Sequence, residues 1–458
     1  TMVYEASLKL MALAELNDGD VDRDAITALA KFLQDAQLKK GENPGSWSYS
    51  PQGLDLGGDR SNAQFAVAAL AAARRRGVPV PPETLKSARL HFDKQQSPDG
   101  GWSYQAIGGS TGSMTAAGIA STCLLESAIP IGPERGDDAQ PACCLKSPAN
   151  ASLMRAHDWL TNRFSVRHNP RSQSWLLYYL RELEIASSAH GVRFYGSRDW
   201  YRDGTEFLLA GQSQRDGSWR GDGLLENDPI VGTCFALLFL TRGNAPVLFF
   251  KLDYEADAAK YGAPRELGVL TDHISGSAGW PRHVVWQRLG LNDCRHGDES
   301  VVHEAPILFL RGEKAPEFRD EDLELLKTYV ERGGTIFAQP ACGSKDFDQG
   351  FRALVAKLYP DGQLARLKAD HPVFSSESKL DADAVELHGL EVGGKTRIIY
   401  APQDLACLWS RADEIAPART DEMRKQIEQA LQIGINAATY ATGKKLHGKI
   451  WSKPAAAQ

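Results

Sequence analysis

The chain has 458 residues, enough for two or three domains that each bury a core of their own. Its formal net charge of −6 argues against a partner held mainly through phosphates, so we expect no nucleic acid partner. No apolar run reaches the ~18 residues that a membrane-spanning helix needs, and the sequence therefore predicts no transmembrane segment.

The seven cysteines show no spacing typical of a metal site or of a disulfide framework. Only Cys143 and Cys144 are close in sequence, and no Cys-x-x-Cys or Cys/His pattern occurs. We therefore expect no metal, no cofactor and no disulfide framework. The first residues, Thr1 to Tyr4, already read as helix, so we expect the chain to begin inside a repeat, as a truncated product would.

Three segments in the first half repeat a pattern of Gln, a short turn, Gly and then Trp. The pairs are Gln37 with Trp47, Gln96 with Trp102, and Gln212 with Trp219. The spacing between the second and third tryptophans is close to twice the spacing between the first two. This regularity predicts a degenerate copy in between, for which Asn169 to Trp175 is the candidate.

Each copy lies between two helical stretches. We expect helices before the glutamine at 84–95 and 204–211, and helices after the tryptophan at 63–75, 115–127 and 230–240. Apolar residues recur there at helical spacing, as in Phe65, Leu70 and Ala73. Because the second helices are rich in small residues, they can approach one another closely around an axis. The pattern therefore predicts two concentric rings of helices.

These segments resemble the QW-type repeats of the α/α toroid superfamily, which includes squalene and other terpene cyclases and the β subunits of protein prenyltransferases. The same architecture occurs in some polysaccharide lyases and in complement-type thioester domains. The resemblance implies an all-α toroid repeat domain over residues 1–243, incomplete at its N-terminus. The resemblance predicts a fold but not a chemical activity, because one fold hosts many functions.

In toroid enzymes the site lies near the loops that enter the inner helices. The corresponding loops here carry Asp55, Asp59 and Asp228, which are the candidate acids of such an enzyme. The Asp-x-Asp-Asp motif of squalene-type cyclases and the Cys-Gly-Glu-Gln run of thioester domains are both absent, and no histidine accompanies Cys234 as a zinc ligand. The alternative for Asp55 and Asp59 is to cap the helix that starts near Asn62.

Aromatic residues near the repeat turns could line a cavity for a sugar or a lipid. As residues that define the repeat, they are expected to be structural. The set comprises Tyr49, Trp102, Tyr104, Trp175, Tyr178, Tyr179 and Trp219.

After residue 245 the pattern changes to short apolar strands that alternate with helices. We expect strands at 247–252, 284–289, 306–310, 335–339 and 397–400. We expect helices at 264–275, 320–332, 347–359 and 421–442. This alternation predicts an α/β domain over 246–447 with a flavodoxin-like parallel sheet, followed by a tail at 448–458.

The run from Pro306 to Phe374, together with Gly434-Ile435-Asn436, resembles an uncharacterised bacterial domain family with a class I glutamine-amidotransferase-like fold. Its landmarks are Pro316-Glu317-Phe318, Ala341-Cys342-Gly343-Ser344 and Asp370-His371-Pro372-Val373-Phe374. That family often follows toroid repeats or membrane-anchored modules, and its biochemical role is not established.

Cys342 follows a predicted parallel strand, at the place where open α/β sheets bind ligands. Amidotransferases use a Cys-His-Glu triad, so the resemblance makes Cys342 and His371 candidates, with Asp370 or Glu377 as a third member. The Gly-x-Cys-x-Gly elbow of such enzymes is incomplete, because its first glycine is missing.

Two alternatives remain for this loop. One is a ligand or anion site at Cys342, Gly343 and Ser344, because their N–H groups precede a helix. The other is a purely structural role.

The leading interpretation is a non-catalytic binding protein of the bacterial cell envelope or periplasm, with a cytoplasmic location as the alternative. Its partner would be an unknown small molecule, a glycan or a protein. The alternative function is a toroid-class enzyme that acts on a glycan or an isoprenoid with carboxylates at the inner-helix loops. Convergent carboxylates in an open cavity would favour the enzyme, whereas a filled axis would favour the scaffold.

Overall fold

The computed structural model describes residues 2–16, 22–51, 57–105, 108–129, 150–254, 265–291, 299–382, 385–413, 420–446 and 448–449. These residues divide into two compact units. The helical unit contains the described residues up to Gly243, apart from Gly191–Arg193. The α/β unit contains Gly191–Arg193 and the residues from Asn244 onward. In the described residues, no helix is both long and apolar enough to cross a membrane.

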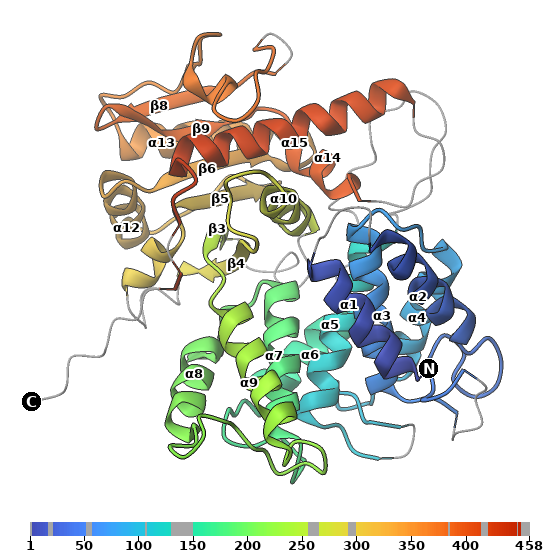
Figure 1. Ribbon diagram of the computed structural model, residues 1–458. Helices are drawn as coiled ribbons and strands as arrows, with labels where there is room; N and C mark the ends of the chain where they lie inside the picture. Colours follow the sequence, from blue (N-terminus) through green and yellow to red (C-terminus); the bar gives the residue numbers. More distant parts are fainter. Residues whose placement is uncertain are drawn as a thin grey trace, which may run out of the picture. The chain divides into compact units, whose positions relative to one another are not determined.

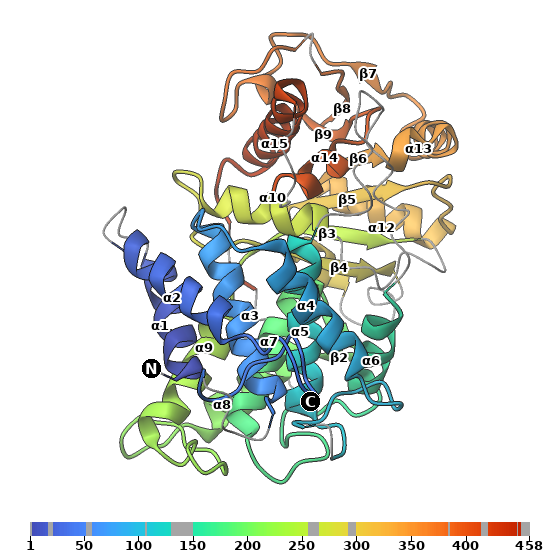
Figure 2. The ribbon, with the colours of Figure 1, turned by 90° about the vertical axis from the view of Figure 1, so that its right-hand side faces the viewer.

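The helical unit is built from helix pairs. Its helices are α1 (Val3–Leu16), α2 (Arg23–Ala36), α3 (Arg60–Arg75), α4 (Pro82–Lys94), α5 (Gly112–Ala128), α6 (Ala151–Thr161), α7 (Leu176–His190), α8 (Trp200–Gly211) and α9 (Pro229–Gly243). A short hairpin of β1 (Phe194–Tyr195) and β2 (Arg198–Asp199) precedes α8. Each odd-numbered helix packs against the next odd-numbered helix, from α1 to α9. The even-numbered helices flank this row (Figures 1 and 2).

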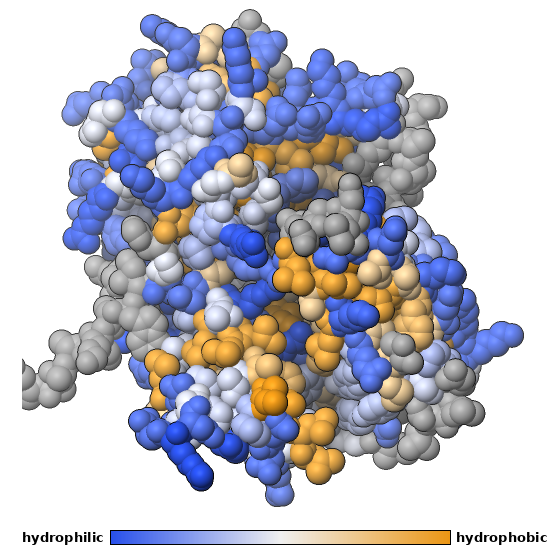
Figure 3. Space-filling view, in the orientation of Figure 1, coloured by the Kyte–Doolittle hydropathy of each residue, from blue (hydrophilic) through white to orange (hydrophobic). Residues whose placement is uncertain are grey.

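Small residues let the odd-numbered helices lie close to the repeat tryptophans. A Cβ atom built on Gly118 of α5 would come within 2.4 Å of the Trp102 ring. At the end of the row, α9 is apolar on all sides, and Ile230, Leu237 and Leu238 are exposed. Figure 3 shows apolar surface over α1 and α9 on this face of the helical unit.

The same set of hydrogen bonds, which we call the Gln/Trp joint, recurs at each of the three copies of the Gln/Trp pattern. In every copy the glutamine Nε2 donates to the carbonyl of the turn glycine: Gln37 to Gly45 (3.1 Å), Gln96 to Gly100 (2.8 Å) and Gln212 to Gly217 (2.9 Å). In every copy the buried indole Nε1 donates to a carbonyl of the preceding even-numbered helix: Trp47 to Leu33 (2.7 Å), Trp102 to Phe92 (2.9 Å) and Trp219 to Leu208 (2.7 Å).

The first two joints also reach the next even-numbered helix. Gln37 Nε2 donates to the carbonyl of Thr84 in α4 (2.9 Å), and Gln96 Nε2 donates to that of Ser152 in α6 (2.7 Å). Gly100 has a φ of 91°, and a Cβ atom there would lie 2.7 Å from the carbonyl oxygen of Arg155. Only glycine fits this approach, because it has no Cβ and tolerates positive φ.

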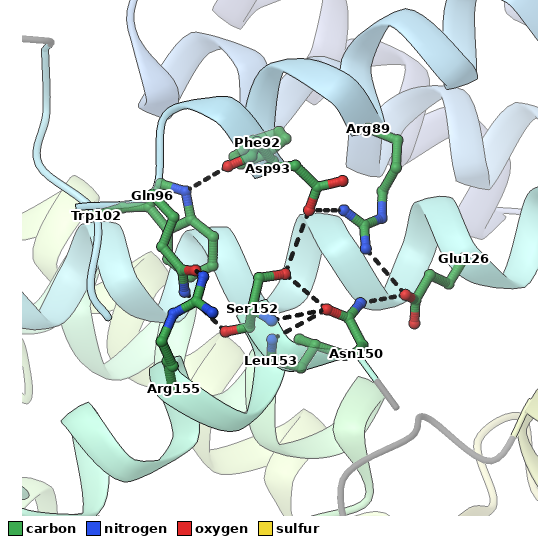
Figure 4. Close-up of polar contacts among 10 residues, drawn as sticks. All are labelled: Arg89, Phe92, Asp93, Gln96, Trp102, Glu126, Asn150, Ser152, Leu153 and Arg155. Atoms are coloured by element: carbon green, nitrogen blue, oxygen red, sulfur yellow. Dashed lines mark hydrogen bonds and ion pairs between the residues drawn. The ribbon is translucent and has the colours of Figure 1, made fainter. Parts of the chain in front are cut away.

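Ion pairs complete the joint between α4, α5 and α6 (Figure 4). Arg89 of α4 pairs with Asp93 in the same helix and with Glu126 of α5 (3.1 Å). Asn150, the N-cap of α6, donates to Glu126 and accepts from the backbone N–H groups of Ser152 and Leu153. The repeat pattern in the sequence thus encodes contacts between neighbouring helix pairs.

The α/β unit holds one seven-stranded sheet in the order β4-β3-β5-β6-β9-β8-β7. The strands are β3 (Val247–Asp253), β4 (Val285–Gly290), β5 (Ile307–Gly312), β6 (Thr335–Pro340), β7 (Ala365–Arg366), β8 (His388–Val392) and β9 (Lys395–Tyr400). The five parallel strands are ordered 2-1-3-4-5 by their sequence, which is the flavodoxin-like order of doubly wound sheets.

Helices cover both faces of the sheet, as Figure 2 shows. On one face lie α10 (Arg265–Ser275), α14 (Leu405–Arg411) and α15 (Asp421–Thr442), and on the other lie α12 (Asp320–Glu331) and α13 (Lys345–Leu358). Strand residues such as Phe249, Phe309 and Phe337 are therefore fully buried, in a core that Trp409 joins from α14. Three 3₁₀ turns, η2 (Glu299–Glu304), η3 (Ala341–Gly343) and η4 (Pro372–Phe374), lie between these elements.

The prediction of an all-parallel sheet was wrong at one edge. Strands β7 and β8 are antiparallel, and β8 forms a hairpin with β9 around Gly393 and Gly394. These glycines have φ values of 61° and 77°. Two consecutive residues with positive φ are what a type I′ hairpin turn requires, so the Gly-Gly pair was a signal for this hairpin.

Candidate functional site

Asp59 caps helix α3, which was one of the two roles predicted for it. Its Oδ1 accepts from the backbone N–H of Asn62 (2.8 Å), and its Oδ2 accepts from the Asn62 side chain (2.7 Å). Asp228 also caps a helix, since it accepts from the backbone N–H of Ile230 (2.8 Å) in α9. Asp55 lies outside the described residues.

Asp59 also lies beside a cluster of tyrosines. Burial raises the pKa of Asp59, although hydrogen bonds from Asn62 and from the Tyr104 hydroxyl act in the opposite direction. The hydroxyls of Tyr104 and Tyr49 lie 2.7 Å apart. Tyr4 lies close enough that the charge of Asp59 adds to burial in raising the Tyr4 pKa.

A second buried acid, which sequence reasoning missed, also acts on Tyr4. Glu182 of α7 is fully buried and paired with Arg181. Burial raises the pKa of Glu182, while Arg181 opposes the shift. Glu182 raises the pKa of both Tyr4 and Tyr178. The adjacent Arg181 and Glu182, which follow the apolar first turns of α7, were the available signal.

Aromatic rings from four odd-numbered helices fill the space between those helices. Tyr4 of α1 packs edge-on against Phe65 of α3, with ring centroids 5.0 Å apart. Phe65 stacks with Tyr178 of α7 at 6.2 Å, and Tyr178 packs against Phe235 of α9 at 5.9 Å. This chain of rings favours the scaffold over an enzyme with an open cavity.

The aromatic set predicted from the repeats divides into two groups. The buried members are Trp102, Tyr178, Tyr179 and Trp219. Tyr49 and Tyr104 are about 40% and 38% exposed, and Trp175 is half-buried. Within this set, Tyr49, Tyr104 and Trp175 keep accessible aromatic surface for a ligand.

In the α/β unit, Cys342 occupies the predicted position after a parallel strand. Strand β6 ends at Pro340, and the one-turn η3 leads into α13. Cys342 and Gly343 have φ values of 54° and 66°, both left-handed. Cys342 is disulfide-bonded, and so is Cys407 of α14. The sequence predicted no disulfide framework and gave no signal for the disulfide bonding of these two residues. A disulfide presents no thiolate for catalysis.

His371 lies at the amino ends of the parallel strands, whereas Cys342 lies at their carboxyl ends. Its Nε2 is 2.9 Å from the Thr396 hydroxyl, at the amino end of β9, and its Nδ1 accepts from the backbone N–H of Val373. Strands β6 and β9 run parallel, with Ile336 paired with Ile398. About six residues of strand, or roughly 20 Å, therefore separate the two candidates. Together they do not form a catalytic pair.

Neither Glu377 nor Asp370, the candidates for the third member of the triad, joins Cys342 and His371 in one site. Glu377 pairs with Lys444 (2.7 Å) and accepts from the Thr439 hydroxyl of α15. Asp370 precedes His371 in an exposed turn. The charge of Asp370 raises the His371 pKa, but burial lowers it by more.

The carboxylate of Asp404 occupies the loop where an anion was predicted. Asp404 caps α14 by accepting from the backbone N–H of Cys407 (3.2 Å), and it also accepts from the N–H of Cys342 (2.7 Å). Arg311, at the end of β5, donates to both oxygens of Asp404. In the same loop, Ser344 caps α13 by accepting from the N–H of Phe347 (3.3 Å).

More buried charged residues lie next to Arg311. They belong to β3 and α10, and the strand order reverses between β3 and β5. Lys251 of β3 pairs with Glu266 of α10 (2.9 Å), and Arg311 approaches the same carboxylate at 3.8 Å. Burial alone would raise the pKa of Glu266, but Lys251 and Arg311 outweigh it and lower the pKa to about 2. The Arg311 pKa is raised, because Asp404 and Glu266 outweigh the effect of burial.

Gln339 of β6 adds a polar group beside these charges. It pairs with Arg311 in the sheet register, and its Oε1 accepts from the backbone N–H of Ala406 (2.9 Å). Its buried Nε2 has no hydrogen-bond partner among the described residues. We call Lys251, Glu266, Arg311, Gln339 and Asp404 the switch-point cluster. In the described part of the chain, no group of three or more His, Cys, Asp or Glu side chains could hold a metal ion.

Comparison with known families bears on this unit. Residues 295–442 match a family described as a domain of unknown function, DUF4159. The match includes Arg311, Gln339, Cys342 and Asp404, whereas Lys251 and Glu266 precede it. No curated protein matches the chain.

Proposed function

We propose that this chain is a non-catalytic binding protein that joins an α/α toroid to an amidotransferase-like α/β domain. The observation that carries the proposal is the separation of Cys342 from His371 by the length of a strand. The disulfide at Cys342 and the aromatic filling between the odd-numbered helices support it further. Catalysis of the amidotransferase type needs a free thiolate within hydrogen-bond reach of its base.

The fold assignments rest on separate features. The succession of odd-numbered helices, with a recurring Gln/Trp joint, supports the toroid. The strand order and the strand–turn–helix around Cys342 support the amidotransferase-like fold.

The switch-point cluster is the proposed ligand site of the α/β unit. It lies at the carboxyl ends of the strands where their order reverses, which is where open α/β sheets bind ligands. The unpaired Gln339 Nε2 is a donor for such a ligand, which would be a small molecule, a glycan or a peptide. We place the protein in the bacterial cell envelope, because disulfides such as those of Cys342 and Cys407 persist in oxidising compartments.

A glutaminase assay of the full chain tests the absence of catalysis. Ammonia release from glutamine would be measured with and without dithiothreitol, beside Cys342→Ala and His371→Ala. We expect the unsubstituted protein to match Cys342→Ala in both conditions. Glutamine hydrolysis that appears on reduction and disappears in Cys342→Ala would overturn the proposal.

The second candidate is a toroid-class hydrolase of a glycan. One observation favours it: Asp59 and Glu182 are both buried, both have raised pKa values, and both act on Tyr4. A carboxyl group with a raised pKa is what a general acid requires. Release of reducing ends from bacterial cell-wall glycan, lost in Asp59→Asn, would select this function over the binding protein.

A further inference from the structure

The first Gln/Trp joint shows how an even-numbered helix docks on the turn that precedes it. Gln37 Nε2 donates to the carbonyl of Thr84 in α4 (2.9 Å). A Cβ atom on Gly45 would lie 2.1 Å from the carbonyl oxygen of Ser87, which is three residues further along the same helix. The glutamine thus binds one carbonyl of the docked helix, and the glycine leaves room for another.

The second joint repeats this register with α6. Gln96 Nε2 donates to the carbonyl of Ser152 (2.7 Å). A Cβ atom on Gly100 would lie 2.7 Å from the carbonyl oxygen of Arg155, again three residues further along the helix. Arg155 also donates to the side chain of Gln96 (Figure 4). Two separate joints therefore seat the first turns of an α-helix in the same way.

The third joint has the same donor and the same glycine, yet its turn is open. Among the described residues, Gln212 Nε2 donates to the carbonyl of Gly217 and to no second carbonyl. A Cβ atom on Gly217 would meet nothing nearer than the Gln212 side chain, at 3.8 Å. Gly217 is exposed, whereas Gly45 and Gly100 are buried under α4 and α6. The third joint thus presents the features that seat a helix in the other two.

An apolar stripe of α9 begins beside this open turn. The backbone N–H of Trp219 donates to the Thr233 hydroxyl of α9 (3.1 Å), so this part of the helix lies next to the joint. The exposed residues of α9 recur at helical spacing and are mostly apolar: Ile230, Cys234, Leu237, Leu238 and Thr241. By contrast α5, which follows the second joint, exposes no residue, because α4 and α6 pack against it.

We propose that the third joint and the exposed stripe of α9 bind an amphipathic α-helix of a partner protein. The first turns of that helix lie on Gln212 and Gly217, with the carbonyl register of α4 and α6, and its apolar face covers the stripe. An amphipathic helix is the occupant that both other joints hold. The inference depends on the recurrence of the joint, and it is independent of any ligand in the α/β unit.

Titration of the full chain with a peptide of its own sequence tests the proposal. The probe is fluorescein-labelled peptide 150–163, which contains the helix that docks on the second joint. We expect one peptide to bind per chain, measured by fluorescence anisotropy, and to slow the alkylation of the exposed thiol of Cys234 by iodoacetamide. The control peptide carries Ala156→Pro, which breaks the helix. No binding, or equal binding of the control peptide, would overturn the proposal.

Two variants with matched controls locate the site. Gln212→Glu should weaken the peptide by roughly tenfold, because a carboxylate then faces the helix carbonyls in place of a donor. Gln214→Glu, which makes the same change at an exposed position of the same turn, should leave binding unchanged. Leu237→Glu should also weaken the peptide, whereas Leu90→Glu, at an exposed leucine of α4, should not. Thermal unfolding checks that each variant folds, and unchanged binding in Gln212→Glu or Leu237→Glu would contradict the third joint as the site.

Sedimentation of the chain without peptide separates a partner protein from a second copy of this chain. We expect the same monomeric mass for the unsubstituted chain and for Leu237→Glu. A dimer that Leu237→Glu dissociates would overturn the proposal in favour of self-association through α9.

Discussion

Arg311 and Asp404 form a bidentate ion pair at the carboxyl ends of the parallel strands. The Nε–Oδ1 distance is 2.9 Å and the Nη2–Oδ2 distance is 2.7 Å. The same carboxylate accepts the N–H groups of Cys342 and Cys407. One side chain therefore fixes the end of β5, the turn after β6 and the start of α14.

Asp404→Ala should destabilise the α/β unit by about 3–5 kcal/mol, because it leaves the buried Arg311 without this partner. The matched control is Asp35→Ala, which breaks the exposed Lys31–Asp35 pair and should cost less than about 1 kcal/mol. Urea unfolding monitored by circular dichroism measures both. Equal effects of the two substitutions would show that Asp404 does not organise this edge.

Trp102→Ala should destabilise the helical unit by about 3–5 kcal/mol, because it empties a fully buried site and removes the hydrogen bond to Phe92. Trp175→Ala is the control, since Trp175 is half-buried and packs edge-on against Tyr178. We expect its cost to be well below that of Trp102→Ala in the same unfolding experiment. The opposite ranking would contradict the structural role of the repeat tryptophans.

Glu266 should make the α/β unit acid-sensitive. Its pKa falls to about 2 in the folded protein, below the ~4.3 of an unperturbed glutamate. A carboxyl group with a lowered pKa stabilises the fold above its unfolded pKa, and this contribution is lost as the pH falls from about 4 toward 2.

The variant Glu266→Gln isolates that contribution. The wild-type protein should lose more unfolding free energy than the variant between pH 5 and pH 2, when both are measured by urea unfolding. Parallel pH profiles would mean that Glu266 titrates normally in the folded state.

Cys342 should resist alkylation until the protein is reduced. In the unreduced chain, iodoacetamide should modify Cys234, which is a free and exposed thiol on α9. Cys342 should react only after dithiothreitol treatment, because it is disulfide-bonded. Peptide mass spectrometry reports both sites. Equal labelling of the two cysteines without reductant would refute the disulfide.

The elements that could be predicted from the sequence are those with local signals. The Gln/Trp copies predicted the turns and the helices beside them, because the glutamine and tryptophan bond to backbone close in sequence. The alternating pattern after residue 245 predicted the parallel strands. The degenerate copy departs from the rule, because Trp175 has a φ of 66° and lies against Gly223.

The candidate sites depended on contacts that are distant in sequence. Asp404 is separated from Cys342 by 62 residues, and only the sheet order brings its carboxylate to that loop. His371 lies instead at the amino end of β9, beside Thr396, which is the other end of the strands from Cys342. The triad implied by the amidotransferase resemblance thus suggested the wrong partner for Cys342.

The joint at Gln96 has a consequence for how this protein can change over time. Gln96 and Gly100 fix the start of α6 through Ser152 and Arg155, whereas the chain reaches α6 from α5 through residues 130–149. Because the register of α6 is set from the preceding turn, that connection can gain or lose residues without displacing the helix. We therefore expect the length of this connection to vary among related chains, whereas Gln96 and Gly100 are retained with α6.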